Sequence, residues 1–190
     1  MRRGGGRFHP AALLSALALL GLGFPVQAEP LRDAASGLAV SPPPGYVATA
    51  SSPSGAQTAR FTLRRPQDQD TGCTLAYVPA PQNALYTQTQ INSRTRLPGW
   101  QTLERTRLAA VYELKEQTLF EQRGVAGVRI IADLRPRSGL PARAQELRSF
   151  FAIMETPRGR TTLVCVAEKD AFDTRRAEFE AALRGVAPPG

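Results

Sequence analysis

The most regular pattern of apolar and polar positions lies near the C-terminal end of the chain. Two apolar runs, LRSFFAIME and TTLVCVA, stand on either side of the segment TPRG. Pro157 has the φ that the second position of a type I turn requires, and Gly159 can adopt a left-handed φ at little cost. The pattern predicts a β-hairpin with a three-residue loop and a bulge, in which Thr156 pairs with Arg160.

Both faces of this predicted hairpin are apolar. In the predicted register, Phe151 lies opposite Cys165 and Ile153 lies opposite Leu163. The other face carries Phe150, Ala152, Val164 and Val166. An antiparallel pair at a solvated surface has one polar face, so we predict central strands with a layer packed on each side. A slip of one residue would exchange the two faces and leave this prediction unchanged.

The segment after Ala167 has the pattern of an amphipathic helix. Its apolar residues recur at helical spacing, and they are Phe172, Phe179, Leu183 and Val186. Asp170 is a suitable N-cap and Gly185 a suitable stop. We expect this helix to cover one face of the hairpin, with core packing favoured over a ligand clamp for its two phenylalanines.

The preceding chain predicts further strands and one more helix. ARFTLRR and GCTLAYV are predicted to pair across a polar connector, and a second hairpin is predicted to turn near Gly124. Residues 82–97, between two prolines, predict a weakly amphipathic helix, and QTLERTRLA after Trp100 predicts a strand. Together these elements predict the α+β class: an antiparallel β-sheet with helices packed against it, in a single domain over residues 37–186. Residues 29–36 are expected to be a leader and residues 187–190 a C-terminal tail.

The first residues have the parts of a secretory signal peptide. The basic start MRRGGGRFHP precedes the apolar run AALLSALALLGLGF, which is short for a membrane-spanning helix. Small residues at the end of residues 1–28 predict cleavage after Ala28. No later run is apolar enough to span a membrane. We therefore expect a periplasmic or secreted protein, with an uncleaved anchor as the alternative.

Removal of residues 1–28 changes the charge and the chemistry that is available. The formal net charge of the whole chain is +8, and the removed segment holds three arginines and no acids, so the mature chain carries +5. The single histidine, His9, also lies in this segment. Serine–histidine or cysteine–histidine catalysis and histidine-ligated zinc or copper are therefore excluded for the mature chain. We expect no cofactor, no metal site and no catalytic residue.

Two cysteines remain, and both lie in strand-like runs. A disulfide between Cys73 and Cys165 is predicted because exported proteins meet an oxidising compartment. It would close a loop of roughly a hundred residues, which is worth about 4 kcal/mol in the chain-entropy model. The alternative is two separate buried thiols.

The densest positive patch of the mature chain lies in and after the segment RPRSGLPARAQ. It comprises Arg135, Arg137, Arg143 and Arg148. Such a patch can bind an anionic headgroup, a phosphate or an acidic partner, and a solvated loop is the alternative. No aromatic residues alternate with these arginines, so nucleic acid is not a predicted partner.

The order of elements and three phrases resemble the PsbP-like superfamily. The phrases are GLAVSPPPGYVAT, FEQRGVAGVRI and SFFAIMETPRGRTTLVCVAEKDAFDTRRAEFEAALRGV. This superfamily includes the extrinsic photosystem subunit and small exported bacterial proteins of unassigned role. The resemblance spans most of residues 37–186 and lies in layout and turn placement. It implies an antiparallel sheet with packed helices and, in many members, binding or assembly rather than catalysis, and it assigns no site residue.

Three functions follow from these patterns. The first is an exported, periplasmic, non-enzymatic module that binds an envelope protein or an anionic component. The second is a carrier that holds a small amphipathic or lipidic ligand between sheet and helix. The third is a hydrolytic enzyme that uses paired carboxylates, although the acidic residues show no recognisable arrangement.

Overall fold

The structure is a computed structural model that describes Met1 and residues 29–190. The predicted signal peptide and His9 lie outside the described residues. Among the helices of the described part, none is long and apolar enough to cross a membrane.

The centre of the molecule is a seven-stranded antiparallel sheet with the order β3-β4-β5-β9-β8-β7-β6. Its strands are β3 (Val47–Ala50), β4 (Ala59–Arg64), β5 (Gly72–Pro79), β6 (Tyr112–Gln122), β7 (Val125–Leu134), β8 (Leu147–Thr156) and β9 (Gly159–Glu168). The predicted hairpin β8–β9 lies in the middle, with at least two strands on either side. This position explains why both of its faces are apolar.

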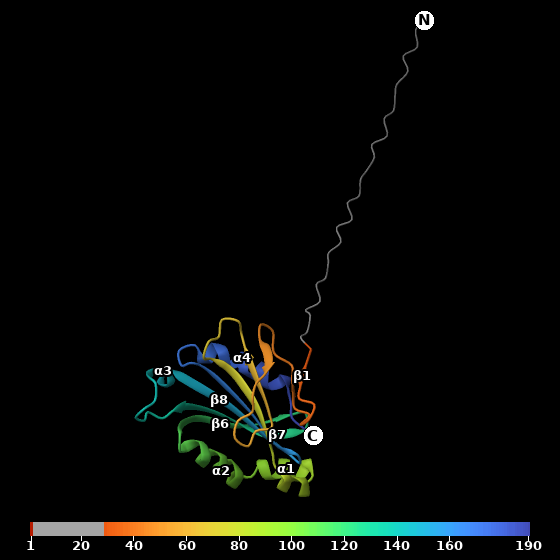
Figure 1. Cartoon of the computed structure of the whole chain (residues 1–190), viewed down its shortest axis with the longest axis vertical. Helices are drawn as coiled ribbons and strands as arrows, with labels where there is room; N and C mark the ends of the chain where they lie inside the picture. The colour runs from red at the N-terminus through yellow and green to blue at the C-terminus, as the bar shows by residue number, and fades with distance from the viewer. Residues whose placement is uncertain (2–28) are drawn as a thin grey trace.

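Helices cover the sheet from both sides (Figure 1). One side is covered by α4 (Phe172–Gly185), which contacts β8 and β9. The other side is covered by α1 (Gln88–Thr95), which lies on β7 and β8, and α2 (Pro98–Ala109), which lies on β6. Two short helices, η1 (Pro81–Leu85) and α3 (Ala142–Gln145), lie in connections. The predicted α+β class and the layer on each side of the hairpin are confirmed.

A small second sheet joins the start of the domain to its end. It has the order β1-β2-β10 and comprises β1 (Leu31–Arg32), β2 (Ala39–Val40) and β10 (Val186–Ala187). β1 lies in the segment expected to be a leader, and β10 follows α4 directly. The small sheet therefore holds both ends of the described domain together.

The predicted hairpin register is wrong by one residue. Thr156 pairs with Gly159, so the loop contains two residues, and Phe150 rather than Phe151 lies opposite Cys165. Gly159 is needed for a reason other than the turn, since a Cβ at this position would lie 2.3 Å from the carbonyl oxygen of Val78. The glycine permits a close approach of β5 to the hairpin.

One helix prediction and one strand prediction also need correction. The segment predicted as one helix over residues 82–97 consists of η1 and α1, which are separated because Thr87 forms a capping box with Gln90. The predicted strand after Trp100 is helix α2. Pro98 opens this helix, and Trp100, Glu104 and Leu108 recur every four residues, which is a helical spacing.

The disulfide predicted between Cys73 and Cys165 is present in the structure. The two residues lie directly opposite each other on β5 and β9. They are 92 residues apart in the sequence, and closing a loop of that length in the unfolded chain is worth about 4 to 5 kcal/mol in the chain-entropy model. Both cysteines are buried in the apolar core beneath α4.

Candidate binding site

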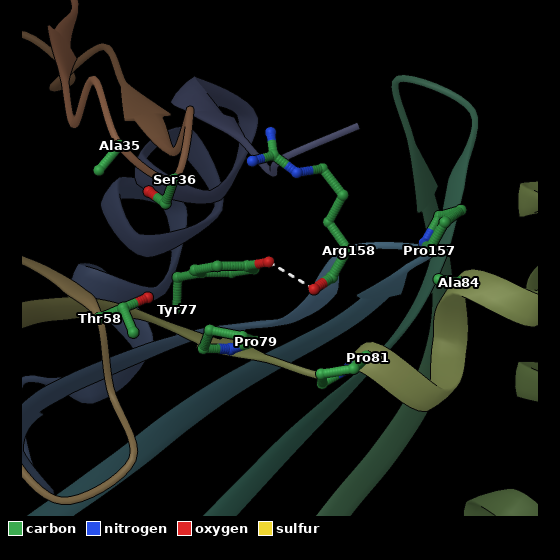
Figure 2. Close-up of a pocket in the computed structure, with 9 residues that line it drawn as sticks. All are labelled: Ala35, Ser36, Thr58, Tyr77, Pro79, Pro81, Ala84, Pro157 and Arg158. Atoms are coloured by element: carbon green, nitrogen blue, oxygen red, sulfur yellow. Dashed lines mark hydrogen bonds between the residues drawn. The ribbon is translucent and has the colours of Figure 1, made fainter.

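A surface hollow of about 430 Å³ lies where β5, η1 and the β8–β9 turn meet (Figure 2). The residues that line it are mostly apolar or small: Ala35, Ser36, Thr58, Tyr77, Pro79, Pro81, Ala84, Pro157 and Arg158. Six of them are exposed, so the hollow is open to solvent. Its shape and lining are suited to an apolar group presented from outside.

Local sequence explains why the chain leaves β5 at this point. Pro79 is the last residue of β5, and Pro81 stands at the start of η1. Proline has no backbone N–H and cannot donate to a sheet ladder. The chain therefore turns away from the sheet over these two prolines and forms one wall of the hollow.

A hydrogen bond closes the floor of the hollow. The Tyr77 hydroxyl donates to the backbone carbonyl of Arg158 over 2.5 Å, which joins β5 to the β8–β9 turn (Figure 2). Burial raises the pKa of the Tyr77 hydroxyl, so this donor keeps its proton at physiological pH. The floor is thus a neutral aromatic ring in a fixed position.

The wall formed by η1 is held by a buried amide. The Asn83 side chain donates to the Glu155 carboxylate at 2.8 Å and to the Thr156 carbonyl oxygen at 3.1 Å. Asn83 is the buried residue of η1. Its bonds fix η1 against the end of β8, so the hollow is preformed.

Next to this wall, the chain exposes two large apolar side chains. Leu85 is 83% exposed and Tyr86 is 44% exposed. The Arg94 guanidinium lies over the Tyr86 ring, 5.2 Å from its centroid. Large apolar side chains that follow an apolar hollow are typical of a protein contact surface.

Behind the hollow, two buried carboxylates share one arginine. Arg160 donates to Glu104 of α2 at 2.7 Å and to Glu155 of β8 at 2.7 Å. Burial acts to lower the pKa of the Arg160 guanidinium, but the two carboxylates outweigh it and the pKa is raised. Because each carboxylate is paired, this cluster holds α2 on the sheet and lacks the free acid and base that glycoside hydrolysis needs.

A second, smaller hollow of about 230 Å³ lies beside the β4–β5 loop and is lined by charged groups. Arg175 of α4 donates to Asp68 at 3.1 Å and to the Tyr46 hydroxyl at 2.8 Å. The Tyr46 hydroxyl donates to Glu178 at 2.7 Å, and burial together with this bond raises the pKa of Tyr46 to about 12. These paired groups hold α4 against the loop. Within the described residues, no three His, Cys, Asp or Glu side chains are grouped to hold a metal ion.

The structure separates the four arginines of the predicted anion or partner patch into different environments. Arg143 binds Asp70, Glu146 and Glu168, and Arg148 binds Asp133. Arg135 donates to the backbone carbonyls of Ala109 and Tyr112, and Arg137 is exposed. Two of the four positive charges are thus compensated by neighbouring carboxylates.

The hollow was not foreseen from the sequence. The sequence placed Tyr77 on a strand and Pro157 in a turn, but it does not show that these two segments lie next to each other. A signal was available in the prolines, since Pro79, Pro81 and Pro157 each end or interrupt an extended run. Prolines concentrated at one end of a sheet form rigid apolar surface, because their rings need no hydrogen-bond partner.

Comparison with known proteins identifies the fold. No protein-family model matches the chain, and no curated protein sequence matches it. The solution structure of cyanobacterial PsbP (CyanoP) from Synechocystis sp. PCC 6803 is similar, with a TM-score of 0.55, 13% sequence identity, and coverage of 92% of this chain and 98% of that chain. A crystal structure of a protein of unknown function, PA94 from Pseudomonas aeruginosa, matches with a TM-score of 0.43, 10% identity, and coverage of 85% and 97%. The layout that the sequence predicted is confirmed, and the chain has a PsbP-like α+β fold.

Proposed function

We propose that this chain is an exported, non-enzymatic binding or assembly module that docks a segment of a partner protein in the hollow between β5, η1 and the β8–β9 turn. The predicted signal peptide and the disulfide support export. The PsbP-like fold is consistent with a binding role, and the hollow supplies the place where binding occurs.

The observation that carries this proposal is the combination of an apolar lining, an open mouth and a fixed shape. The volume of about 430 Å³ lies at the lower end of the roughly 300 to 1,000 Å³ that ligand pockets occupy. It is large enough for one or two apolar side chains. Because Asn83 and Tyr77 already hold the walls, binding does not have to order them.

A carrier of a lipidic ligand has less support. That alternative needs space between the sheet and a helix, but Phe150 of β8 and Phe179 of α4 are 0% exposed and their ring centroids are 6.1 Å apart. The layer beneath α4 is filled by side chains of the protein itself. The hollow lies at the end of the sheet, where a long acyl chain would remain in water.

A photo-crosslinking experiment in cells of the source organism tests the proposal. A benzophenone amino acid replaces Ala84, which lines the hollow, or Ala177, which is exposed on α4. We expect a discrete protein adduct from position 84 and none of the same mass from position 177. The adduct should disappear when Thr58→Trp fills the hollow.

Two results would count against the proposal. A lipid adduct from position 84 would favour the carrier. The same adducts from both positions, or adducts that persist with Thr58→Trp, would show that the hollow is not the place of binding. Secretion of each variant and its thermal unfolding serve as controls for folding.

A further inference from the structure

The rim of the hollow carries an arginine that the protein itself does not neutralise. Arg158, in the β8–β9 turn, is exposed. Within the part of the chain that the structure describes, its guanidinium forms no salt bridge, unlike those of Arg129, Arg148, Arg160 and Arg176. The side chain extends from the turn back above Tyr77 (Figure 2). It therefore places a positive charge at the mouth of an apolar hollow.

A second guanidinium reaches the same part of the rim. A Cβ at Gly37 would lie 3.3 Å from Nη1 of Arg158, and Nη1 of Arg32 donates to the carbonyl oxygen of Gly37 at 3.4 Å. Both guanidinium groups therefore lie beside Gly37. The segment that bears Gly37 forms the wall opposite η1 through Ala35 and Ser36.

The nearby carboxylate is occupied by its own loop. Asp33 accepts hydrogen bonds from the Ser36 backbone N–H at 2.7 Å and from the Ser36 hydroxyl at 2.6 Å. These bonds lower the pKa of the Asp33 carboxyl, so it is ionised at neutral pH and offsets one of the two arginines. The rim keeps a net positive charge, centred on Arg158.

We propose that the partner segment docked in this hollow is acidic: an apolar side chain fills the space over Tyr77, and an Asp or Glu close to it in sequence binds the Arg158 guanidinium. This inference rests on the proposed function and adds the chemistry of the partner. A guanidinium can donate two parallel hydrogen bonds to one carboxylate, which fixes orientation as well as charge. The mature chain's charge of +5 also attracts an acidic partner at long range.

The open geometry favours a peptide segment over an acidic lipid. The lining residues come from three segments at the molecular surface, and six of the nine are exposed. A peptide needs only a few side chains to be buried, whereas a fatty acid needs its whole chain covered. The occupant is therefore an acidic–apolar stretch of a protein.

Selection of random peptides displayed on phage, with the folded chain from residue 29 as bait, tests this inference. We expect the enriched sequences to carry Asp or Glu within a few residues of Leu, Phe or Trp. Affinity of the synthetic peptides should fall about tenfold or more with Arg158→Gln, which removes a charge-assisted bond. Arg184→Gln, at an exposed arginine near the end of α4, should leave the affinity unchanged.

A salt titration and a filled-hollow variant separate the possible outcomes. Raising the NaCl concentration should weaken binding to the wild type and should have much less effect on Arg158→Gln. Two results would show that the hollow binds a partner segment that is not acidic. In the first, Ala84→Trp abolishes binding and Arg158→Gln does not change it. In the second, the enriched peptides lack Asp and Glu. If Ala84→Trp and the control Ala177→Trp both bind every enriched peptide with the affinity of the wild type, the hollow is not the binding site and both proposals fail.

Discussion

Different interactions attach the helices to the two faces of the central sheet. Beneath α4 the contact is a continuous apolar core that includes Phe150, Phe179 and the buried disulfide. Beneath α1 and α2 the apolar cluster is smaller, and the buried residue of α2 is a charged one, Glu104. The contact of α4 is mainly burial of hydrocarbon, whereas that of α2 combines a smaller apolar contact with a buried ion cluster.

This difference has consequences for how each helix responds to change. Apolar burial is non-directional and proportional to area, so α4 tolerates small shifts as long as its side chains remain covered. A buried ion pair requires fixed geometry, and the loss of one partner leaves an uncompensated charge. The α2 layer, which lies behind one wall of the hollow, is therefore the more specifically positioned of the two.

The largest effect is expected on the α4 face. Phe179→Ala removes a fully buried ring and should lower the free energy of unfolding by about 4 kcal/mol, since it loses both transfer energy and packing. Leu103→Ala on α2, where the side chain is 46% exposed, should cost less than about 0.5 kcal/mol. Urea unfolding followed by far-UV circular dichroism measures both. A loss below about 1 kcal/mol for Phe179→Ala would show that α4 is not held by its apolar stripe.

A smaller but specific effect is expected on the α2 face. Arg160→Leu leaves Glu104 and Glu155 buried without their shared cation and should cost about 2 to 3 kcal/mol, less than for a fully isolated pair because Arg107 still binds Glu104. Trp100, the only tryptophan, lies in α2, so its fluorescence should change with this variant. The exposed control is Arg184→Leu.

A double-mutant cycle sharpens this test. Glu104→Gln in the Arg160→Leu background removes one of the two carboxylates that have lost Arg160, so the double variant should lose less stability than the sum of the single variants. Strict additivity would mean that Glu104 and Arg160 do not interact. The ion cluster would then not be what holds α2.

Sequence patterns foresaw the elements that follow a regular period. The paired runs around TPRG, the stripe from Phe172 to Val186 and the Gly124 turn each depend on local spacing, and each is found in the fold. The register of β8–β9 was missed because Gly159 serves a contact with Val78 from another part of the chain. The turn preferences of neighbouring residues do not reveal a contact with a strand from another part of the chain.

The errors on the α2 side have a related cause. The inner side of α2 has Glu104 between Trp100 and Leu108, so its apolar stripe is interrupted by a charged residue and the segment was interpreted as a strand. Arg175 of α4 is buried because Asp68 and Tyr46 lie opposite it. A charged residue is buried only where it has a partner, and that partner is often distant in the sequence. A local hydropathy pattern does not identify it. The candidate hollow was missed for the same reason.

The smallest effect concerns the polar margin of α4 and depends on pH. Burial acts to raise the pKa of the Asp68 carboxyl, but hydrogen bonds from Arg65 and Arg175 outweigh it and hold the pKa below its usual range. A carboxyl whose pKa is lower in the folded state contributes stability above its unfolded pKa of about 3.9, and this contribution is lost as the pH falls toward the folded pKa. Asp68→Asn should therefore cost about 1 to 2 kcal/mol at pH 7, and the difference from wild type should narrow as the pH falls below 4.

Urea unfolding of both proteins across this pH range measures the difference directly, and comparing variants cancels the contribution of other carboxyl groups. Asp170→Asn, at an exposed position before α4, is the matched control and should lie within about 0.5 kcal/mol of the wild type. If the cost of Asp68→Asn is the same at every pH, the Asp68 carboxylate gains nothing from Arg175. Packing, and not ion pairing, would then hold the edge of α4 near Asp68. The ionic edge of α4 would no longer differ from its apolar centre.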